Sequence, residues 1–346
     1  MKPDAVRFFV CPDCHGELRL DSSDSREVVT GKLTCIDCGR AYPVAKGVPR
    51  FAESEDYADT FGRQWTRWAR TQHDSLNGTD IFRRRLQRYT GWTPESMATK
   101  VVVDAGCGPG GFIDVVERHA AAVVGFDLSK AVDAAYELHG RNPGVFLAQG
   151  DILKPPIRPG VADRLYTFGV VQHTPDPERA FKSLVPLVRE GGEIAVWVYR
   201  RHRIPQPVYW MRLFTAGMPE PRATQFIEWY APKAMVVSGA LGSVPVLGRY
   251  LRRLVPVADY RDRLRLTDEQ YREWALMDTH DMLITRFTFP QMWRDLERWT
   301  AGLEDLRRPS PGEMAAVARV PSCRHGMGSR GPEPRPSVSD PLPRHL

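Results

Sequence analysis

The stretch VVVDAGCGPGG at residues 101–111 decides the fold class of this chain. Its first half is an apolar run of β-branched residues, which is typical of a buried strand. Its second half is rich in glycine and leads into the helix-like run FIDVVERHA. Glycines at such a strand-to-helix turn let the backbone approach a ligand closely and adopt positive φ. The stretch therefore predicts a ligand-binding turn at the end of a strand.

Short apolar runs and helix-like runs alternate through the centre of the chain. Examples between residues 120 and 200 are AAVVGFDLS, AVDAAYELHG, VFLAQGD, ADRLYTFGVV and EIAVWVY. This alternation predicts βαβ units and an α/β fold, in which helices cover both faces of a parallel sheet. Residues 291–299 then indicate an amphipathic helix, and short strand-like pieces follow at 303–306 and 314–320.

Acidic residues end or follow three of the predicted strands. Asp104 precedes the glycines, where its carboxylate would repel a pyrophosphate but suits an ammonium group. Asp127 ends the next apolar run, 19 residues after Gly108, where a carboxylate accepts hydrogen bonds from both hydroxyls of a ribose. Asp151 ends the third run and suits an adenine amino group. Because the turn also lacks the spaced GxGxxG that a pyrophosphate prefers, the set predicts a cationic, phosphate-free adenosine ligand.

These motifs resemble those of the class I S-adenosylmethionine-dependent methyltransferases, in the type 11-like group with DAGCGxG and VVxHTPDP elements. The resemblance implies a Rossmann-like sheet with six parallel strands and one antiparallel strand, of which residues 314–320 form the last. It implies S-adenosyl-L-methionine as cofactor and methyl transfer to a small-molecule, glycan or lipid-linked acceptor. The cofactor-binding residues that it implies are Asp104, Gly106, Gly108, Gly110, Asp127, Leu128, Asp151, Ile152 and Gly169.

His173 is the candidate catalytic residue. It lies in GVVQHTPDP (residues 169–177) after the fourth strand of the core, where the family often has two histidines and this chain has Gln172 before His173. An imidazole with a pKa of ~6.5 accepts a proton from a hydroxyl or ammonium nucleophile, so His173 is a candidate general base or positioning residue. The alternative is a histidine that holds the loop through a backbone hydrogen bond. Tyr166, Trp197 and Tyr199 are candidates for the wall of the substrate site.

Two CxxC pairs stand near the N-terminus. Cys11 and Cys14 form the first pair, and Cys35 and Cys38 form the second after twenty intervening residues. This spacing is typical of a zinc ribbon, in which two tight turns each present two thiolates to one tetrahedral ion. Since all four positions are ligands, we expect a structural Zn²⁺ whose binding stabilises the folded module. Disulfides or free thiols are the alternative.

The residues around the second CxxC pair carry a resemblance of their own. The run CIDCGRAYPVAKGVPRF at residues 35–51 is similar to the end of the small zinc-ribbon proteins that bind and activate methyltransferases. The resemblance implies that such an activator module is fused here to the enzyme that it serves.

The chain of 346 residues is 42% hydrophobic and 26% charged, which is a globular composition and is enough for about two domains. We expect strand-like runs in the ribbon at 6–10, 26–34 and 48–51, and helices around 61–68 and 81–89. Gln64, Trp65 and Arg67 either fold over the cofactor or belong to a helix that packs Phe61, Trp65 and Trp68 into the core. The expected domains are a zinc ribbon at 1–52, a helical linker or lid at 53–98, a methyltransferase domain at 99–320 with a helical basic insert or cap at 200–275, and a disordered tail at 321–346.

The net charge of +6 is concentrated in residues 200–265, which hold 12 Lys and Arg against 4 Asp and Glu and thus a local charge of +8. Arginines with exposed aromatic residues suit RNA phosphates and bases. An apolar face at 235–247 beside basic residues suits an anionic membrane surface instead. The third possibility is a solvated helical cap that selects the substrate. The basic residues singled out are Arg200, Arg201, Arg203, Arg212, Arg249, Arg252, Arg253, Arg261, Arg263 and Arg265.

Two further functions compete with methyl transfer to a small or lipid-linked acceptor. One is a tRNA-modifying methyltransferase, and the other is a non-catalytic scaffold that binds S-adenosylmethionine and is recruited through the zinc ribbon. The N-terminus has no apolar signal-peptide region, and the longest uncharged stretch, residues 234–248, has 15 residues against the ~20 that span a bilayer. We therefore expect a cytoplasmic protein, with the basic insert as its point of peripheral membrane or RNA contact.

Overall fold

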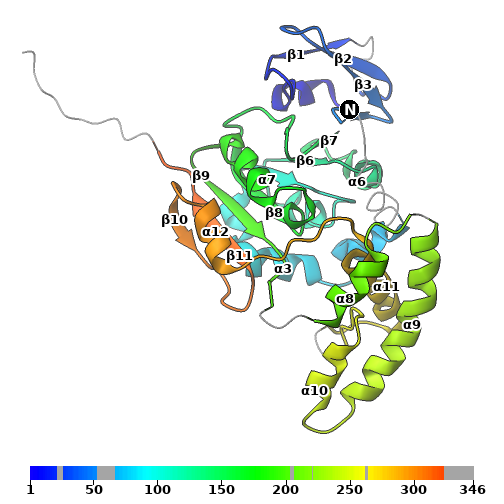
Figure 1. Cartoon of the computed structure of the whole chain (residues 1–346). Coiled ribbons are helices and arrows are strands. Elements are labelled where there is room, and N and C mark those ends of the chain that lie inside the picture. The colour runs from blue at the N-terminus through cyan, green and yellow to red at the C-terminus, as the bar shows by residue number, and fades with distance from the viewer. Residues whose placement is uncertain (22–25, 53–66, 203–205, 220, 262–263, 323–346) are drawn as a thin grey trace, which may run out of the picture.

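The computed structural model describes residues 1–21, 26–52, 67–202, 206–219, 221–261 and 264–322. It shows a small N-terminal sheet above a large central sheet, and a helical insertion that projects away from both (Figure 1). The predictions for Phe61, Gln64 and Trp65, and those for the tail from residue 323, lie outside the described residues.

The central sheet has seven strands in the order β10-β11-β9-β8-β5-β6-β7. The strands β7, β6, β5, β8 and β9 pair in parallel, β11 is antiparallel to β9, and β10 is antiparallel to β11. Six strands thus point one way and β11 points the other, which confirms the predicted Rossmann-like α/β fold. The strands are β5 (Val101–Ala105), β6 (Ala122–Asp127), β7 (Val145–Gln149), β8 (Ala162–Phe168), β9 (Val188–Trp197), β10 (Glu304–Arg307) and β11 (Ala315–Arg319).

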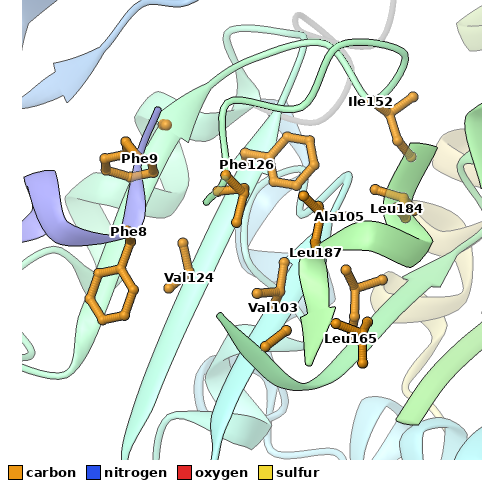
Figure 2. Close-up of a cluster of buried hydrophobic side chains, with 14 of the residues drawn as sticks. Phe8, Phe9, Val103, Ala105, Val124, Phe126, Ile152, Leu165, Leu184 and Leu187 are labelled. Atoms are coloured by element: carbon orange, nitrogen blue, oxygen red, sulfur yellow. The ribbon is translucent and has the colours of Figure 1, made fainter. Parts of the chain in front are cut away.

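Both faces of the central sheet are buried because successive side chains of each strand point to opposite sides. Val103 and Val124 belong to a core shared with Phe8, Phe9, α7 and α12. Figure 2 shows the two phenylalanines beside Val124. The neighbouring Val102 belongs to a second core shared with α3, α5 and α6. The helices are α3 (Ile81–Thr90), α4 (Pro94–Met97), α5 (Ile113–Val116), α6 (Ala131–His139), α7 (Pro177–Leu184) and α12 (Trp293–Trp299).

Local signals explain where several of these helices begin and end. The side chain of Asp176 accepts a hydrogen bond from the backbone N–H of Arg179 at 3.0 Å, and Pro177 occupies the first turn, so α7 begins at this point. Helix α3 ends at Gly91, whose φ of 71° is the left-handed conformation that glycine adopts readily. Short helical turns connect the larger elements, namely η2 (Ala69–Gln72), α2 (Asp74–Asn77), η3 (Val171–His173) and η4 (Val185–Leu187).

The N-terminal module is a four-stranded antiparallel sheet, β1 (Leu18–Asp21), β2 (Gly31–Cys35), β3 (Ala41–Ala45) and β4 (Val48–Pro49), preceded by the helical turn η1 (Pro3–Phe8). The strand predicted at residues 6–10 is wrong, since Pro3 opens a 3₁₀ turn and only Phe9 forms a single bridge to Ile157. A short apolar run cannot by itself distinguish a strand from a buried turn. The run at 26–34 is strand only from Gly31 onward.

The N-terminal module packs along β7, which is the last strand of the central sheet. The backbone N–H of Phe51 donates to the carbonyl of Gln149 at 2.8 Å, and the Lys2 ammonium donates to the carbonyl of Val145 at 2.8 Å. The rings of Phe8 and Phe146 lie 4.7 Å apart between their centroids. The ribbon and the central sheet therefore share one hydrophobic core.

The helical insertion consists of α8 (Pro207–Thr215), α9 (Arg222–Gly242), α10 (Gly248–Leu251), η5 (Arg252–Leu254) and α11 (Asp268–Ile284). Helix α11 packs against α8 and α9, and the α9–α10 hairpin forms the projecting arm in Figure 1. A reciprocal cap between Thr267 and Gln270 starts α11, which runs on to Ile284 and so passes the predicted end of the insert at 275. Among the described residues, no helix combines the length and the apolar content needed to cross a membrane.

Candidate functional site

A cavity of ≈ 820 Å³ lies between the central sheet and the helical insertion. Its sheet side consists of the segments that follow strands β5, β6, β7, β8 and β9, so it opens at the carboxyl ends of the parallel strands. This is the edge at which open α/β sheets bind their ligands. Its opposite side consists of residues from α3, α11 and the segment around η5.

The glycine turn after β5 forms one wall of the cavity. Gly106 has φ of 85°, and a Cβ there would lie 2.4 Å from a methyl group of Val170. Gly108 has φ of 52° and would direct a Cβ into open space, and its N–H donates to a carboxylate oxygen of Asp127 at 2.9 Å. Gly108 therefore lines the cavity with free space beside its Cα.

Asp127 is held in place at the end of β6. Its second carboxylate oxygen accepts hydrogen bonds from the backbone N–H of Ser129 at 2.8 Å and from the Ser129 hydroxyl at 2.7 Å. The carboxylate thus joins the glycine turn to the start of α6 and lies on the cavity wall. Of the nine predicted cofactor-binding residues, the wall includes Gly106, Gly108, Asp127, Leu128, Ile152 and Gly169.

Three predicted cofactor-binding residues do not line the cavity. Asp104 is buried beneath the glycine turn and accepts a hydrogen bond from the Tyr166 hydroxyl at 2.9 Å. Burial raises the pKa of Asp104 to about 8, because removal from water disfavours the charged carboxylate and the nearby charge of Asp127 adds to the effect. Gly110 faces the ring of His139, and the Asp151 carboxylate accepts from the N–H of Leu153 at 2.9 Å. Their roles in cofactor binding stay predictions.

His173 lines the cavity at the end of η3. Its Nδ1 lies 2.9 Å from the carbonyl oxygen of Phe287, so the neutral ring carries its proton on Nδ1 and presents Nε2 as the acceptor. Nε2 lies 3.8 Å from a carboxylate oxygen of Asp281, and the ring edge packs against Tyr199 with 5.3 Å between centroids. The Tyr199 hydroxyl donates to the same carboxylate. The structure thus contains both the backbone contact and the cavity position considered for His173.

Helices α3 and α11 contribute polar residues that the sequence analysis did not single out. Asp278 lies on the cavity and accepts a hydrogen bond from the Tyr260 hydroxyl, while the Arg85 guanidinium lies 5.0 Å from the ring of Trp274. Burial raises the pKa of Asp278 to about 6, although the charge of Arg85 opposes this rise. The available signal was the pair Asp278 and Asp281, three residues apart in the mostly apolar run WALMDTHDMLI at residues 274–284.

Part of the predicted basic insert also reaches the cavity. Arg200, Arg212, Arg249, Arg252 and Arg253 line it. Arg212 has a structural role, because its guanidinium donates to the carbonyls of Met282 and Thr285 at 2.9 and 2.7 Å. Among the aromatic residues predicted for the substrate wall, Trp197 and Tyr199 lie on the cavity and Tyr166 lies beneath it.

The four cysteines of the N-terminal module meet at one point. Their sulfur atoms all lie within 4.8 Å of one another, with 3.7 Å between Cys11 and Cys38 and 3.4 Å between Cys14 and Cys35. Four sulfurs at about 2.3 Å from one tetrahedral Zn²⁺ are separated by about 3.8 Å, so the cluster fits a zinc ion. None of the four forms a disulfide, and Cys107, the other cysteine in the described ranges, is a buried free thiol.

Comparison with known proteins gives two family matches. Residues 103–196 match the family described as "Methyltransferase domain", and residues 6–47 match the family described as "Trm112p-like protein". The central part of the sheet thus lies in a segment that matches a methyltransferase domain. The N-terminal module, with its four cysteines, lies in a segment that matches a Trm112p-like protein.

Individual relatives cover only part of the chain. A ubiquinone biosynthesis O-methyltransferase of Cupriavidus pinatubonensis is 33% identical over 109 residues, which are 31% of this chain and 44% of that protein. The enzyme of the same description from Sodalis glossinidius is 33% identical over 98 residues, or 28% and 39% of the two chains. The chain thus aligns with less than half the length of these relatives. Among solved structures, an N-methyltransferase from Bradyrhizobium japonicum in complex with S-adenosylhomocysteine has 18% identity and a TM-score of 0.35, covering 42% of this chain and 74% of that chain.

Proposed function

We propose that the protein transfers the methyl group of S-adenosylmethionine to an oxygen, nitrogen or carbon atom of an acceptor bound in the cavity. The observation that carries the proposal is that one cavity brings together the open backbone of Gly108, the carboxylate of Asp127 and the polar groups around His173. Bound S-adenosylmethionine supplies an already activated methyl group. The protein chiefly has to align the acceptor with that group and exclude water.

The residues of the wall suit the cofactor. The Asp127 carboxylate would accept hydrogen bonds from ribose hydroxyls, and the apolar side chains of Phe126, Leu128 and Ile152 would contact the adenine ring. The open position above Gly108 leaves room for the methionine part of the cofactor. Asp104 would support this turn from below through its own burial and its hydrogen bond from Tyr166.

We assign His173 the role of proton acceptor for a hydroxyl or ammonium acceptor group. The contact of its Nδ1 with the Phe287 carbonyl directs Nε2 to receive the proton, and the Asp281 carboxylate lies 3.8 Å from Nε2. The transfer would form a bond from the acceptor atom to the methyl carbon and break the bond from that carbon to sulfur, so that S-adenosylhomocysteine leaves, while the acceptor's proton moves to Nε2.

The acceptor class that fits the cavity is a small or lipid-linked molecule, since the cavity lies between the sheet and the insertion and is lined by aromatic and charged side chains. We place the reaction in the cytoplasm, where thiols remain reduced and free to hold zinc. A tRNA acceptor and a non-catalytic scaffold are the functions against which this proposal is tested.

The first test is calorimetric titration of S-adenosylhomocysteine into the purified protein. We expect micromolar binding to the wild type and binding at least about tenfold weaker to Asp127→Asn, since a charged hydrogen-bond acceptor is lost. The matched control is Asp305→Asn, which changes an exposed aspartate on β10 and should leave the affinity unchanged. Absence of heat with the wild type would reject the cofactor site and favour a scaffold that does not use this cavity.

The second test addresses His173 once an acceptor has been found by screening lipids, glycans, small metabolites and tRNA. We expect His173→Gln to lower kcat by about a hundredfold while the affinity for S-adenosylhomocysteine is retained. A kcat within twofold to threefold of the wild type would reduce His173 to a loop-holding residue.

A further inference from the structure

The end of the α9–α10 arm exposes a cluster of aliphatic side chains. We call residues 244–254 the tip. Val246 is 85% exposed, Leu247 56% and Leu254 59%, and Tyr250 beside them is 51% exposed. Single exposed apolar residues are common on protein surfaces, but a group on one projecting turn indicates a contact with something apolar.

The backbone of the tip packs closely against α9. A Cβ on Gly248 would lie 2.2 Å from the carbonyl oxygen of Gly242, so α10 approaches α9 as closely as only glycine allows. The N–H of Gly248 donates to the carbonyl of Val244 at 2.8 Å. Val246 has φ of 63°, a left-handed conformation that is an outlier for a β-branched residue. A strained, highly exposed valine on this turn indicates that its position is functional.

Positive charge surrounds this apolar cluster. The sequence contains no Asp or Glu between Glu228 and Asp259. The guanidinium groups of Arg249 and Arg253 lie 4.6 and 5.9 Å from the Tyr250 ring. Both arginines are exposed, and neither forms an ion pair with any carboxylate in the described part of the chain. The tip therefore presents aliphatic side chains beside positive charge, which complements an anionic surface with an apolar interior.

The tip also belongs to the cavity mouth. Arg249 and Arg253 line the cavity together with Arg200 and His202, which follow β9. Burial lowers the pKa of His202, and the nearby charges of Arg200 and Arg253 lower it further. Arg200, His202 and Arg253 therefore lie close together. The acidic residues Asp278 and Asp281 lie on α11 in the same cavity. A ligand with an anionic group at the mouth and a hydroxyl or amine near His173 matches this distribution of charge.

We propose that the tip docks on an anionic lipid surface and that Arg200, His202, Arg249 and Arg253 bind the phosphate of a membrane-resident acceptor. The first part, docking of the tip on a membrane, does not depend on whether the protein transfers methyl groups. The second part, binding of a membrane-resident acceptor, rests on the proposed methyl transfer. Aliphatic residues dominate the tip, and its one aromatic ring, Tyr250, is covered by two arginines. This composition favours lipid chains over RNA, whose bases stack on open aromatic rings.

The test is flotation of the full chain with vesicles of phosphatidylcholine, with and without a minority of phosphatidylglycerol. We expect binding only to the vesicles that contain phosphatidylglycerol and a decrease as salt rises. Val246→Asn/Leu247→Ser/Leu254→Ser should weaken that binding by about thirtyfold or more, because three aliphatic side chains no longer enter the lipid. Asparagine suits position 246 because it tolerates the left-handed conformation. The matched control, Val29→Ser/Ile36→Ser, removes aliphatic residues of similar exposure from the ribbon and should bind as the wild type does.

The charge is tested with Arg249→Gln/Arg253→Gln. At about 1 kcal/mol for each arginine near an anionic surface, we expect vesicle binding to fall about thirtyfold. Arg179→Gln/Arg294→Gln removes two exposed arginines from α7 and α12 and is the control of equal charge. Thermal unfolding midpoints verify that each variant is folded. Equal binding of wild type and both tip variants, or binding to neutral vesicles alone, would overturn the proposal.

Two further arms identify the source of the phosphate. The first arm titrates inorganic pyrophosphate into the protein. If pyrophosphate binds the wild type but not the arginine variant, and vesicles do not bind, the ligand is a soluble phosphate compound and the docking on lipid is rejected. Binding of tRNA in place of vesicles would equally overturn the proposal. The calorimetric titration of S-adenosylhomocysteine into the wild type separates the two hypotheses, because cofactor binding without vesicle binding rejects only the docking, and vesicle binding without cofactor binding rejects only the methyl transfer.

Discussion

The zinc ribbon and the cavity are two sites built in opposite ways. The ribbon takes its four ligands, Cys11, Cys14, Cys35 and Cys38, from two tight turns within one short module. The cavity takes its walls from segments spread between Gln72 and Met314, which meet only because the sheet and the insertion bring them together. The ribbon thus depends on a metal and on local spacing, whereas the cavity depends on the hydrophobic core of the whole chain.

The difference also concerns what stabilises each region. A module of about fifty residues buries too little apolar surface to fold firmly alone, so its stability must come from the ion and from the core that it shares with the central sheet. The central sheet buries side chains on both faces and needs no ion. The core around Phe8 and Phe9 contains residues of both the ribbon and the central sheet, so it couples the stability of one to that of the other (Figure 2).

The largest effect is expected from removal of a zinc ligand. Cys35→Ser should abolish zinc binding and unfold the ribbon, because structural zinc contributes on the order of 10 kcal/mol to such modules. Elemental analysis and amide hydrogen exchange of residues 1–51 measure the two losses. Cys107→Ser, which changes the buried thiol outside the cluster, should keep stoichiometric zinc. Stoichiometric zinc in the Cys35 variant would contradict the coordination of one zinc ion by all four sulfurs.

The next effect in size tests the junction between the two regions. Phe9 is fully buried, and its ring lies 5.7 Å from that of Phe51 between centroids. Phe9→Ala should lower the free energy of unfolding by about 4 kcal/mol while zinc remains bound. Urea denaturation measures the loss, with the partly exposed Phe289→Ala as control. A loss below about 1 kcal/mol would mean that the ribbon and the sheet are energetically separate.

A matched pair of glycines separates folding from ligand binding within the cavity. Gly106→Ala should cost about 3 kcal/mol of stability, because positive φ and the clash with Val170 act together. Gly108→Ala should cost about 1 kcal/mol, because its Cβ meets nothing, yet it should weaken S-adenosylhomocysteine binding by filling space in the cavity. Thermal unfolding and calorimetry measure the two quantities. Unchanged affinity in the Gly108 variant would place the cofactor elsewhere.

The smallest change between neighbouring conditions, about 1 kcal/mol for each pH unit, concerns the pH dependence of stability. The pKa of Asp104 is raised from its ordinary value of 3.8 to about 8, so the folded state retains a proton that the unfolded state releases. This contribution to stability is fully present below pH ~4 and is lost as the pH rises towards about 8, at about 1 kcal/mol per pH unit. Asp104→Asn should flatten that slope. Identical slopes for the variant and the wild type, from urea denaturation between these limits, would contradict the burial of a proton at this position.

Local patterns in the sequence were enough to predict the glycine turn, Asp127 and the zinc cluster, because each is set by neighbouring residues. The sheet followed from alternating apolar runs, and the strand at Ala315–Arg319 was predicted as the last one. Sequence reasoning failed where position depends on distant parts of the chain. Asp278 gains its place on the cavity only through the packing of α11, and nothing near it indicates Arg85 as a neighbour.

The same limit explains the errors at the ends of elements. The run that includes Phe8 and Phe9 is apolar because it packs between the ribbon and the sheet, not because it is a strand. Helix α11 crosses the predicted boundary of the insert at 275, and Leu283 and Ile284 at its end are buried in the core that also contains Val102 of the sheet. Burial of this kind arises from tertiary packing, and the neighbouring residues in the sequence do not indicate it.

The position of the ribbon along β7 has a consequence for the behaviour of the protein in solution. Strand β7 is the outermost of the central sheet, and the donors that reach its carbonyls at Val145 and Gln149 come from Lys2 and Phe51 of the ribbon. With the ribbon in place, every residue of β7 is buried. Without the ribbon, β7 would be an open edge strand, and such a strand is a template for pairing with another chain. The ribbon therefore covers an edge at which another chain could pair, and we expect removal of zinc to promote self-association of the protein.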